Sequence, residues 1–304
     1  MVLGRIRGTG EILKATLKYT LIFLLPLFFI LGILYFMTFW TIFISFTDWV
    51  GMRPNYNLVG IKWYEYMVSS DKFWISLRNN ILWLIVFIFP TLFLGLMIAY
   101  ILELYIVKGE SIFRTIFLYP TALSFVVTGT LWAWIYDPAN GVLNSILSRF
   151  GIDTSHLGWI CDPNIAIYCL IAAAIWQYTG FAVVLFQSAL RGGYLKSMIE
   201  AALVDGASGW RLFRYIVVPN IKSAFIIVIA LLAIFSLKVF DLVYVMTQGG
   251  PGISTYVLAF YMYMTTFWKE MVSLGAAISV VIFSLSMIII IPYSYYALKR
   301  WLLK

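Results

Sequence analysis

The chain has 304 residues, a net charge of +8 and a mean hydropathy of +0.95, with 63% hydrophobic and only 11% charged residues. A soluble domain carries about 25% charged residues, so this composition excludes an ordinary soluble protein. Several apolar runs exceed the ~20 residues that a helix needs to cross a bilayer, and no soluble domain of useful size fits between them. We therefore expect an all-α, polytopic membrane protein whose residues 1–304 form a single domain, and we read its positive charge as membrane topology rather than affinity for nucleic acid.

Six transmembrane helices are expected in the apolar runs, with connecting segments that are polar or rich in turn residues. Their ranges are about 18–46, 79–105, 112–136, 165–190, 218–243 and 272–298. Fourteen of the 21 Lys and Arg residues then lie on the side of the two termini, six lie on the other side, and Lys238 lies inside the bilayer. The positive-inside rule therefore places both termini and the loop 191–217 in the cytoplasm of a multi-pass cell-membrane protein.

The chain shows no motif for catalysis. It lacks the phosphate-binding pattern G-x-x-x-x-G-K-[ST], the pattern H-E-x-x-H and any close pair of cysteines. Cys169 is expected inside a membrane helix, so a disulfide with Cys161 is not expected. No convincing catalytic pair lies in the apolar runs either. We expect a chain that is not an enzyme and carries no cofactor of its own.

The most informative stretch is the polar island EAALVDGASGWRLFRYIVVP, residues 200–219. Its four charged residues are too many for hydrocarbon, which places it on a membrane surface. Good helix formers at its start and the turn signal Asp205-Gly206 predict a short helix, a glycine turn and a second helix. Pro219 suits the first turn of the next membrane helix.

The spacing of this island resembles the cytoplasmic EAA signature of ABC importer membrane subunits. It runs Glu-Ala-Ala, three residues, Gly206, nine residues, Ile216, one residue and Val218-Pro219, with Val218 in place of the family's usual Leu. The resemblance implies a coupling helix that docks in a cleft of the ATP-hydrolysing subunit. The residues implied in this coupling are Glu200, Ala201, Ala202, Asp205, Gly206 and Ala207. An ordinary amphipathic connecting loop is the alternative.

Two further stretches are similar to the carbohydrate-importer branch of that family. One is Phe46-Thr47-Asp48-Trp49, and the other is FDLVYVMTQGGP, residues 240–251. Together they resemble the first permease of the maltose/glycerol-phosphate type and imply the type I ABC importer fold. The implied partners are a second, similar permease, two ATPase subunits that bind ATP and Mg, an extracytoplasmic solute-binding protein, a sugar and the lipid bilayer.

A pathway for a sugar through the bilayer needs polar side chains that replace the water around the sugar. It also needs aromatic rings that stack on the C–H surfaces of the sugar. Positions 174, 177, 178 and 181 fall on one face of the fourth expected helix. With three positions of the fifth helix, they resemble the sugar-lining positions of the maltose-transporter membrane subunit. The candidate pathway residues are Gln177, Tyr178, Phe181, Phe235, Ser236 and Val239. Helix–helix packing is an equally open interpretation of any one of them.

Lys238 and Asp241 are the two charged residues expected inside the bilayer near its outer boundary, and both are pathway candidates. Three residues apart on one helix, they could pair in a structural bridge instead of contacting a sugar. A glycerol-phosphate importer is the runner-up function, although it would want cationic groups near the midplane and has only Lys238. A stand-alone, ion-coupled secondary transporter is the alternative class, but it predicts acidic residues in several helices and leaves the EAA spacing unexplained.

Overall fold

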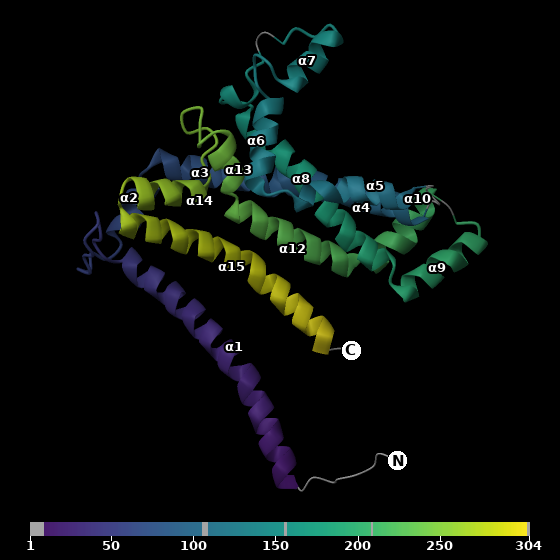
Figure 1. Cartoon of the computed structure of the whole chain (residues 1–304), viewed down its shortest axis with the longest axis horizontal. Coiled ribbons are helices and arrows are strands. Elements are labelled where there is room, and N and C mark those ends of the chain that lie inside the picture. The colour runs from purple at the N-terminus through teal and green to yellow at the C-terminus, as the bar shows by residue number, and fades with distance from the viewer. Residues whose placement is uncertain (1–8, 105–108, 155–156, 208, 303–304) are drawn as a thin grey trace.

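The structure is a computed structural model that describes residues 9–104, 109–154, 157–207 and 209–302 (Figure 1). All regular elements in these ranges are helical, and one isolated antiparallel bridge joins Thr47 to Leu58. The longer helices are α1 (Thr9–Ser45), α3 (Asp71–Leu82), α4 (Ile88–Leu104), α8 (Ala166–Leu190), α12 (Lys222–Lys238) and α15 (Val272–Leu302). The shorter helices are α2 (Lys62–Val68), α5 (Glu110–Leu118), α6 (Phe125–Ile135), α7 (Val142–Arg149), α9 (Gly193–Val204), α10 (Gly209–Leu212), α11 (Val218–Asn220), α13 (Asp241–Met246) and α14 (Leu258–Tyr263).

The described part of the chain holds four single spans long and apolar enough to cross a bilayer. They are Leu24–Ser45, Asp71–Glu103, Ala166–Leu190 and Val272–Tyr295. Two bent helix pairs raise the number to six when each pair counts as one span. The expected all-α membrane protein with six spans is therefore confirmed, with two of the spans bent rather than straight.

The helix expected over about 112–136 is broken in the middle. Ser111–Ala122 and Phe125–Ile135 meet at an angle of 101°. Pro120 lies in the 3₁₀ turn before the bend, and the Ser124 hydroxyl accepts a hydrogen bond of 3.3 Å from the Val127 amide as the N-cap of α6. A proline without an N–H and a new N-cap end one helix and start another, although the apolar run continues.

The helix expected over about 218–243 is also interrupted. Residues Gly209–Asn220 and Lys222–Lys238 meet at 71°, so that Pro219 lies before the bend and not in α12. At the other end, Val239 leaves the helical conformation with a ψ of 123°, and α13 starts afresh at Asp241.

Asn80 holds the broken end of α12 in place. Its amide nitrogen donates to the Ser236 carbonyl at 3.0 Å, and its amide oxygen accepts from the Leu258 amide at 2.8 Å. Both bonds are buried, and they link α3 to α12 and α14. The side chain thus satisfies backbone groups that the interrupted helix leaves open.

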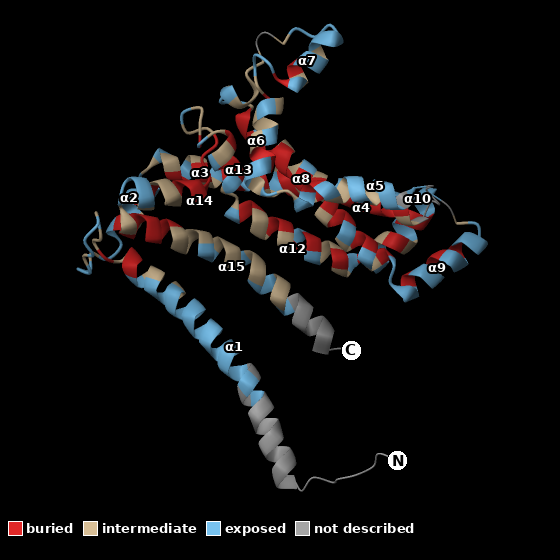
Figure 2. Cartoon of the chain, viewed as in Figure 1, coloured by how far each residue is buried: buried red, intermediate tan, exposed pale blue. Residues whose placement is uncertain are grey.

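The core lies where α4, α8 and α12 pack together, as the buried ribbon segments in Figure 2 show. At Gly95 a Cβ would lie 2.5 Å from the Ala182 Cβ, so glycine is what lets α4 approach α8 this closely. In contrast, only 6% of the most apolar stretch within the α1 span Leu24–Ser45 is buried. Thr47 and Trp49 tie the end of α1 to Ser273 at the start of α15, with bonds of 3.0 and 2.9 Å. All residues of α1 from Leu24 to Met37 are exposed, so they are open to contact with lipid or another subunit.

Candidate functional site

Two adjoining cavities lie beside the break between α12 and α13. The smaller has a volume of about 220 Å³ and the larger about 440 Å³. Each of the eight pathway residues expected from the sequence lines at least one of them. Gln177 and Phe181 line the larger, Ser236, Lys238 and Val239 line the smaller, and Tyr178, Phe235 and Asp241 line both. The fold therefore brings together side chains from helices far apart in the sequence.

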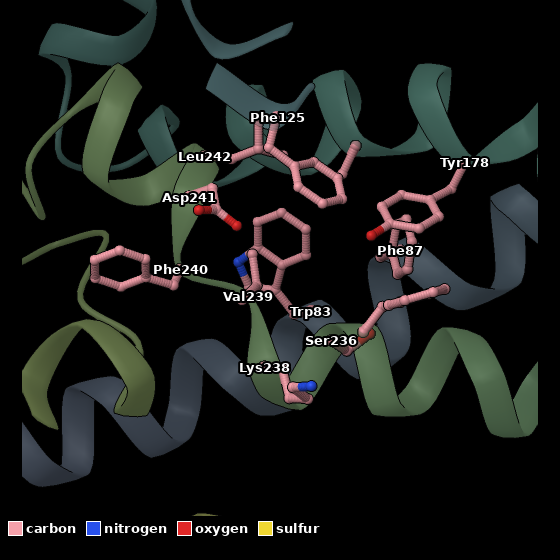
Figure 3. Close-up of a pocket in the computed structure, with 12 residues that line it drawn as sticks. Trp83, Phe87, Phe125, Tyr178, Ser236, Lys238, Val239, Phe240, Asp241 and Leu242 are labelled. Carbon is pink, nitrogen blue, oxygen red and sulfur yellow. The ribbon is translucent and has the colours of Figure 1, made fainter. Parts of the chain in front are cut away.

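Aromatic rings form the wall between the cavities. The Tyr178 ring centroid lies 4.7 Å from that of Phe235, 5.4 Å from Phe87 and 5.7 Å from Phe125, with the last pair stacked. Phe181 meets Phe235 edge to face at 5.9 Å. Figure 3 shows the Tyr178 hydroxyl directed into the space that these rings enclose. Such a wall offers flat apolar faces with a polar group at the edge.

The polar side chains of the wall are partly used by the protein itself. Gln177 donates from Nε2 to the Leu123 carbonyl at 2.9 Å, and the Ser236 hydroxyl donates to the Leu232 carbonyl at 2.9 Å. Two other buried atoms there, Gln177 Oε1 and Trp83 Nε1, have no hydrogen-bond partner among the described residues. Neither of these two atoms has appreciable accessible surface, so both are enclosed by the side chains of the wall.

Lys238 and Asp241 make no ion pair with each other in the described structure, although a pair at this spacing was one interpretation of the sequence. The spacing argument assumed one continuous helix, but Lys238 ends α12 and Asp241 begins α13. Figure 3 shows the Asp241 carboxylate directed towards the Trp83 indole and the Lys238 ammonium directed away from the cluster. Both side chains are exposed, and Lys238 also lines a separate cavity between α14 and α15.

The cavity residues that were not expected from the sequence include the aromatic residues Trp83, Phe87 and Phe125. Trp83 and Phe87 begin and end a π-helical turn between α3 and α4, and their ring centroids lie 5.8 Å apart. The available signal was Asn79-Asn80, three and seven residues before Trp83 and Phe87, since two amides inside an apolar run indicate a polar contact. Phe125 follows the unexpected bend before α6 and carried no such signal.

The loop 191–217, called the coupling loop here after its predicted role, forms the predicted helix, turn and helix. α9 buries Leu195, Ile199 and Ala202 against α10 and the π turn that follows it. Glu200 and Ala201 are exposed on α9, whereas Ala202 belongs to its buried side. The turn follows α9, and the amides of Asp205, Gly206 and Ala207 there bond back to carbonyls of α9 at 3.0, 3.1 and 2.9 Å.

Gly206 has a φ of +80°, and no atom lies within 4 Å of the position that a Cβ would take. Glycine is needed here for backbone conformation and not for lack of space. Leu203 and Val204 on the same tip are exposed, Val204 by 88%. The tip therefore presents an open apolar surface outside the core.

Two contacts fix the coupling loop to the membrane helices. Arg191 Nε lies 2.8 Å from Glu103 Oε2, which joins the end of α8 to the end of α4. The Tyr100 hydroxyl donates to the Gly209 carbonyl at 3.1 Å, and its ring meets Phe213 edge to face at 5.0 Å. A displacement of the loop would therefore act on α4 as well as on α12.

Comparison with known families identifies the chain. Residues 71–304 match the family described as binding-protein-dependent transport system inner membrane component. The chain belongs to this family. It is 45% identical over 284 residues to a probable ABC transporter permease protein of Pyrococcus horikoshii, an alignment that covers 93% of this chain and 97% of that one.

Two further relatives bear names of sugar systems. The glucose import system permease protein of Saccharolobus solfataricus is 30% identical, with 94% and 98% of the two chains covered. The trehalose/maltose transport system permease protein of Thermococcus litoralis is 33% identical, with 84% of each chain covered. The resemblance to carbohydrate-importer permeases is confirmed. Such permeases are the non-enzymatic transport component, so the chain is a multi-pass membrane permease and not an enzyme.

A solved structure shows the same fold. One chain of a bacterial ABC transporter involved in the import of the acidic polysaccharide alginate superposes with a TM-score of 0.77 at 21% identity, covering 95% of this chain and 99% of that one. The type I importer permease fold expected from the sequence is confirmed. At this identity the likeness concerns the fold alone.

Proposed function

We propose that this permease forms half of the pathway of an ATP-driven sugar importer, with its sugar-contacting groups around the two cavities at the α12–α13 break. The observation that supports this proposal is the convergence there of aromatic rings and polar side chains from four helices. Pockets for small ligands are mostly apolar with a few placed polar groups, which is the composition of this wall. The sugar-import names of the relatives support the same substrate class.

The loop 191–217 is proposed to couple this pathway to ATP hydrolysis. Its exposed tip, formed by Leu203, Val204 and Gly206, would insert into a cleft of the ATPase subunit, with Glu200 and Ala201 beside it and Asp205 and Ala207 shaping the turn. Exposed apolar side chains at the end of a rigid helix are what a docking contact requires. The bonds from Glu103 and Tyr100 would carry the movement to the membrane helices.

The remaining partners follow from this role. A second, similar permease would cover part of the exposed surface and complete the pathway, two ATPase subunits would bind ATP and Mg, and a solute-binding protein would deliver the sugar from outside. Both termini and the coupling loop are proposed to face the cytoplasm, as the distribution of Lys and Arg indicates.

Glycerol phosphate is disfavoured as the substrate. Asp241 lines both cavities, whereas Lys238 lines only the smaller and points away from the cluster. A carboxylate repels a phosphate where a cation would be needed. The stand-alone secondary transporter was the alternative interpretation of the sequence. Membership of the binding-protein-dependent family argues against it.

The test is to purify the chain by a tag from its native membrane and to identify the proteins that accompany it. We expect a second permease and an ATPase whose activity rises with a sugar-loaded binding protein. Isolation of the chain alone, together with solute movement in liposomes without ATP, would contradict the proposal. The sugar that gives the largest rise in ATPase activity identifies the substrate.

A further inference from the structure

Two lysine side chains meet at the end of the molecule opposite the coupling loop, although they lie far apart in the sequence. Lys72 belongs to the first turn of α3, and Lys269 follows the π-helical turn Met264–Trp268. The Lys269 side chain adjoins that of Lys72, whose Nζ lies 5.9 Å from the centroid of the Tyr256 ring. Among the described residues, neither ammonium makes an ion pair. Two neighbouring positive charges repel each other unless an anion lies beside them.

The helix ends at this site favour an anion further. Lys72 is the second residue of α3, and Lys269 lies three residues before Val272, the first residue of α15. The N-terminus of a helix carries a partial positive charge, so a lysine is least favourable there and an anion most favourable. Asp71 and Glu270 are the acidic neighbours in the sequence, but both are exposed and neither pairs with these lysines in the described structure. A negative charge from outside the chain would offset the repulsion.

The depth of the lysines in the membrane indicates the source of that charge. The helical run Asp71–Glu103 has 33 residues and a length of about 50 Å, which exceeds the ~30 Å hydrocarbon core by about 10 Å at each end. Lys72, at one end of this run, therefore reaches the headgroup layer. Lys269 lies beside it, just before the span Val272–Tyr295. This is the layer that contains the phosphate groups of the lipids.

Exposed aromatic side chains on the same elements support this depth. Trp74 on α3, Tyr66 on α2, and Phe267 and Trp268 directly before Lys269 are 53–67% exposed. Figure 1 shows α2, α3 and α14 gathered at the end of the molecule farthest from α9. Tryptophan and tyrosine are enriched where a membrane protein crosses the headgroup layer. The rings and the lysines together have the composition of a membrane–water interface.

We propose that Lys72 and Lys269 bind the phosphate group of an anionic phospholipid in the leaflet opposite the coupling loop. One phosphate between the two ammonium groups would join the start of α3 to the start of α15. Clustered lysines at the membrane surface attract anionic lipids, and each contributes to the affinity. An acidic surface of a solute-binding protein is the competing occupant. Such a protein would approach from the water above the exposed rings, so the depth of the site favours the lipid.

The test measures lipid binding to the purified permease complex with its partner subunits. The complex is titrated in detergent with phosphatidylglycerol or with phosphatidylcholine, and bound lipid is counted by native mass spectrometry. Lys72→Gln and Lys269→Gln should each bind phosphatidylglycerol about fivefold more weakly, and the double variant about 20-fold more weakly. Affinity for phosphatidylcholine should stay unchanged. Phosphatidylglycerol should raise the melting temperature of wild type and not that of the double variant.

The matched control is Lys62→Gln. Lys62 is a further exposed lysine on the same side of the membrane spans, but its Nζ bonds to Asp48 at 2.9 Å and lies 4.9 Å from the Trp63 ring centroid. This variant should bind phosphatidylglycerol as wild type does. Equal affinity of wild type and the double variant for phosphatidylglycerol would overturn the proposal, and so would an equal loss in Lys62→Gln.

Two further measurements distinguish the lipid from other anions. Inorganic phosphate at the concentration of the lipid should not displace phosphatidylglycerol, and displacement would overturn the proposal in favour of a site for soluble anions. In nanodiscs of phosphatidylcholine alone, the double variant should keep the rise in ATPase activity that a loaded solute-binding protein produces. Loss of this rise with unchanged phosphatidylglycerol affinity would assign the two lysines to an acidic protein surface instead.

Discussion

Single residues differ in how far their surroundings could be foreseen. Gly206 was expected in a turn because of the Asp-Gly pair, and the structure gives it a φ of +80°. Its conformation depends only on neighbours in the sequence. Trp83 was missed because its place in the cavity depends on a π turn and on helices distant in the sequence. Local chemistry is visible in a sequence, whereas convergence of distant side chains is not.

Gly206→Ala should weaken coupling through backbone strain. An alanine has free space there but is about 1 kcal/mol less stable than glycine at a positive φ. We expect sugar-stimulated ATPase activity to fall about fivefold in the reconstituted complex. Gly206→Asn is the control, because asparagine tolerates this conformation and should retain more activity. Equal loss in both variants would mean that the small size of glycine, and not its conformation, matters.

Tyr178 should contribute to stability through its ring and to uptake through ring and hydroxyl together. Because the half-buried ring packs on Phe87, Phe125 and Phe235, Tyr178→Ala should lower the unfolding free energy by about 2–4 kcal/mol and abolish uptake. Tyr178→Phe keeps these contacts and should melt at the wild-type temperature. Thermal unfolding and uptake in proteoliposomes measure both effects. A stable Tyr178→Ala with normal uptake would contradict a role in the wall.

At the scale of helices, hydropathy located the spans but not their bends. The straight helices α8 and α15 start within about two residues of the expected 165 and 272. The expected helices over 112–136 and 218–243 each contain a sharp turn, of 101° and 71°. Leu123 and Phe125 flank Ser124 at the first turn, whereas the polar residues Asn220 and Lys222 flank Ile221 at the second. The 101° turn coincides with local capping by Ser124, and the amide of Asn80 holds the end of α12 that precedes α13; hydropathy detects neither contact.

Asn80 should be among the polar residues on which the helix arrangement depends most. Asn80→Ala removes two buried bonds, to the Ser236 carbonyl and from the Leu258 amide, and should cost about 2–4 kcal/mol of unfolding free energy. Asn55→Ala removes one exposed bond and should cost less than about 0.5 kcal/mol. Thermal unfolding of both variants in detergent tests the comparison. Similar melting temperatures for the two would show that α12 is held by packing alone.

At the scale of the whole chain, the fold family was recognisable from the sequence because its signature is a local pattern in one loop. The surroundings of α1 were not recognisable from the sequence, because its exposed apolar surface can be covered by lipid or by another chain. The single-chain structure likewise shows half of the proposed pathway. The contacts that a subunit makes on assembly depend on its partner chains, and its own sequence does not describe those chains.

The proposed orientation in the membrane can be tested with the native cysteine Cys161. It is exposed between α7 and α8, on the side opposite the coupling loop, so a membrane-impermeant maleimide should label it in cells whose outer barrier is open but whose cytoplasmic membrane is intact. In a Cys161→Ala background, Ala201→Cys should be labelled only after the membrane is permeabilised. Buried Cys169 serves as the internal negative control. The reverse labelling pattern would invert the topology.

The bend at Ile221 lies at the end of α12 next to the coupling loop, so Ile221 can act as a pivot for the whole of α12. Ile221 is buried at the 71° corner, and Phe235 lies near the other end of the same rigid helix. Thirteen residues of helix separate Lys222 from Phe235, about 20 Å, so a tilt of about 10° at the pivot moves the Phe235 ring by about 3 Å. That displacement is comparable to the thickness of an aromatic ring. Because the Phe235 ring contacts both Tyr178 and Phe181, a small rotation of the loop would shift one of the rings that line both cavities.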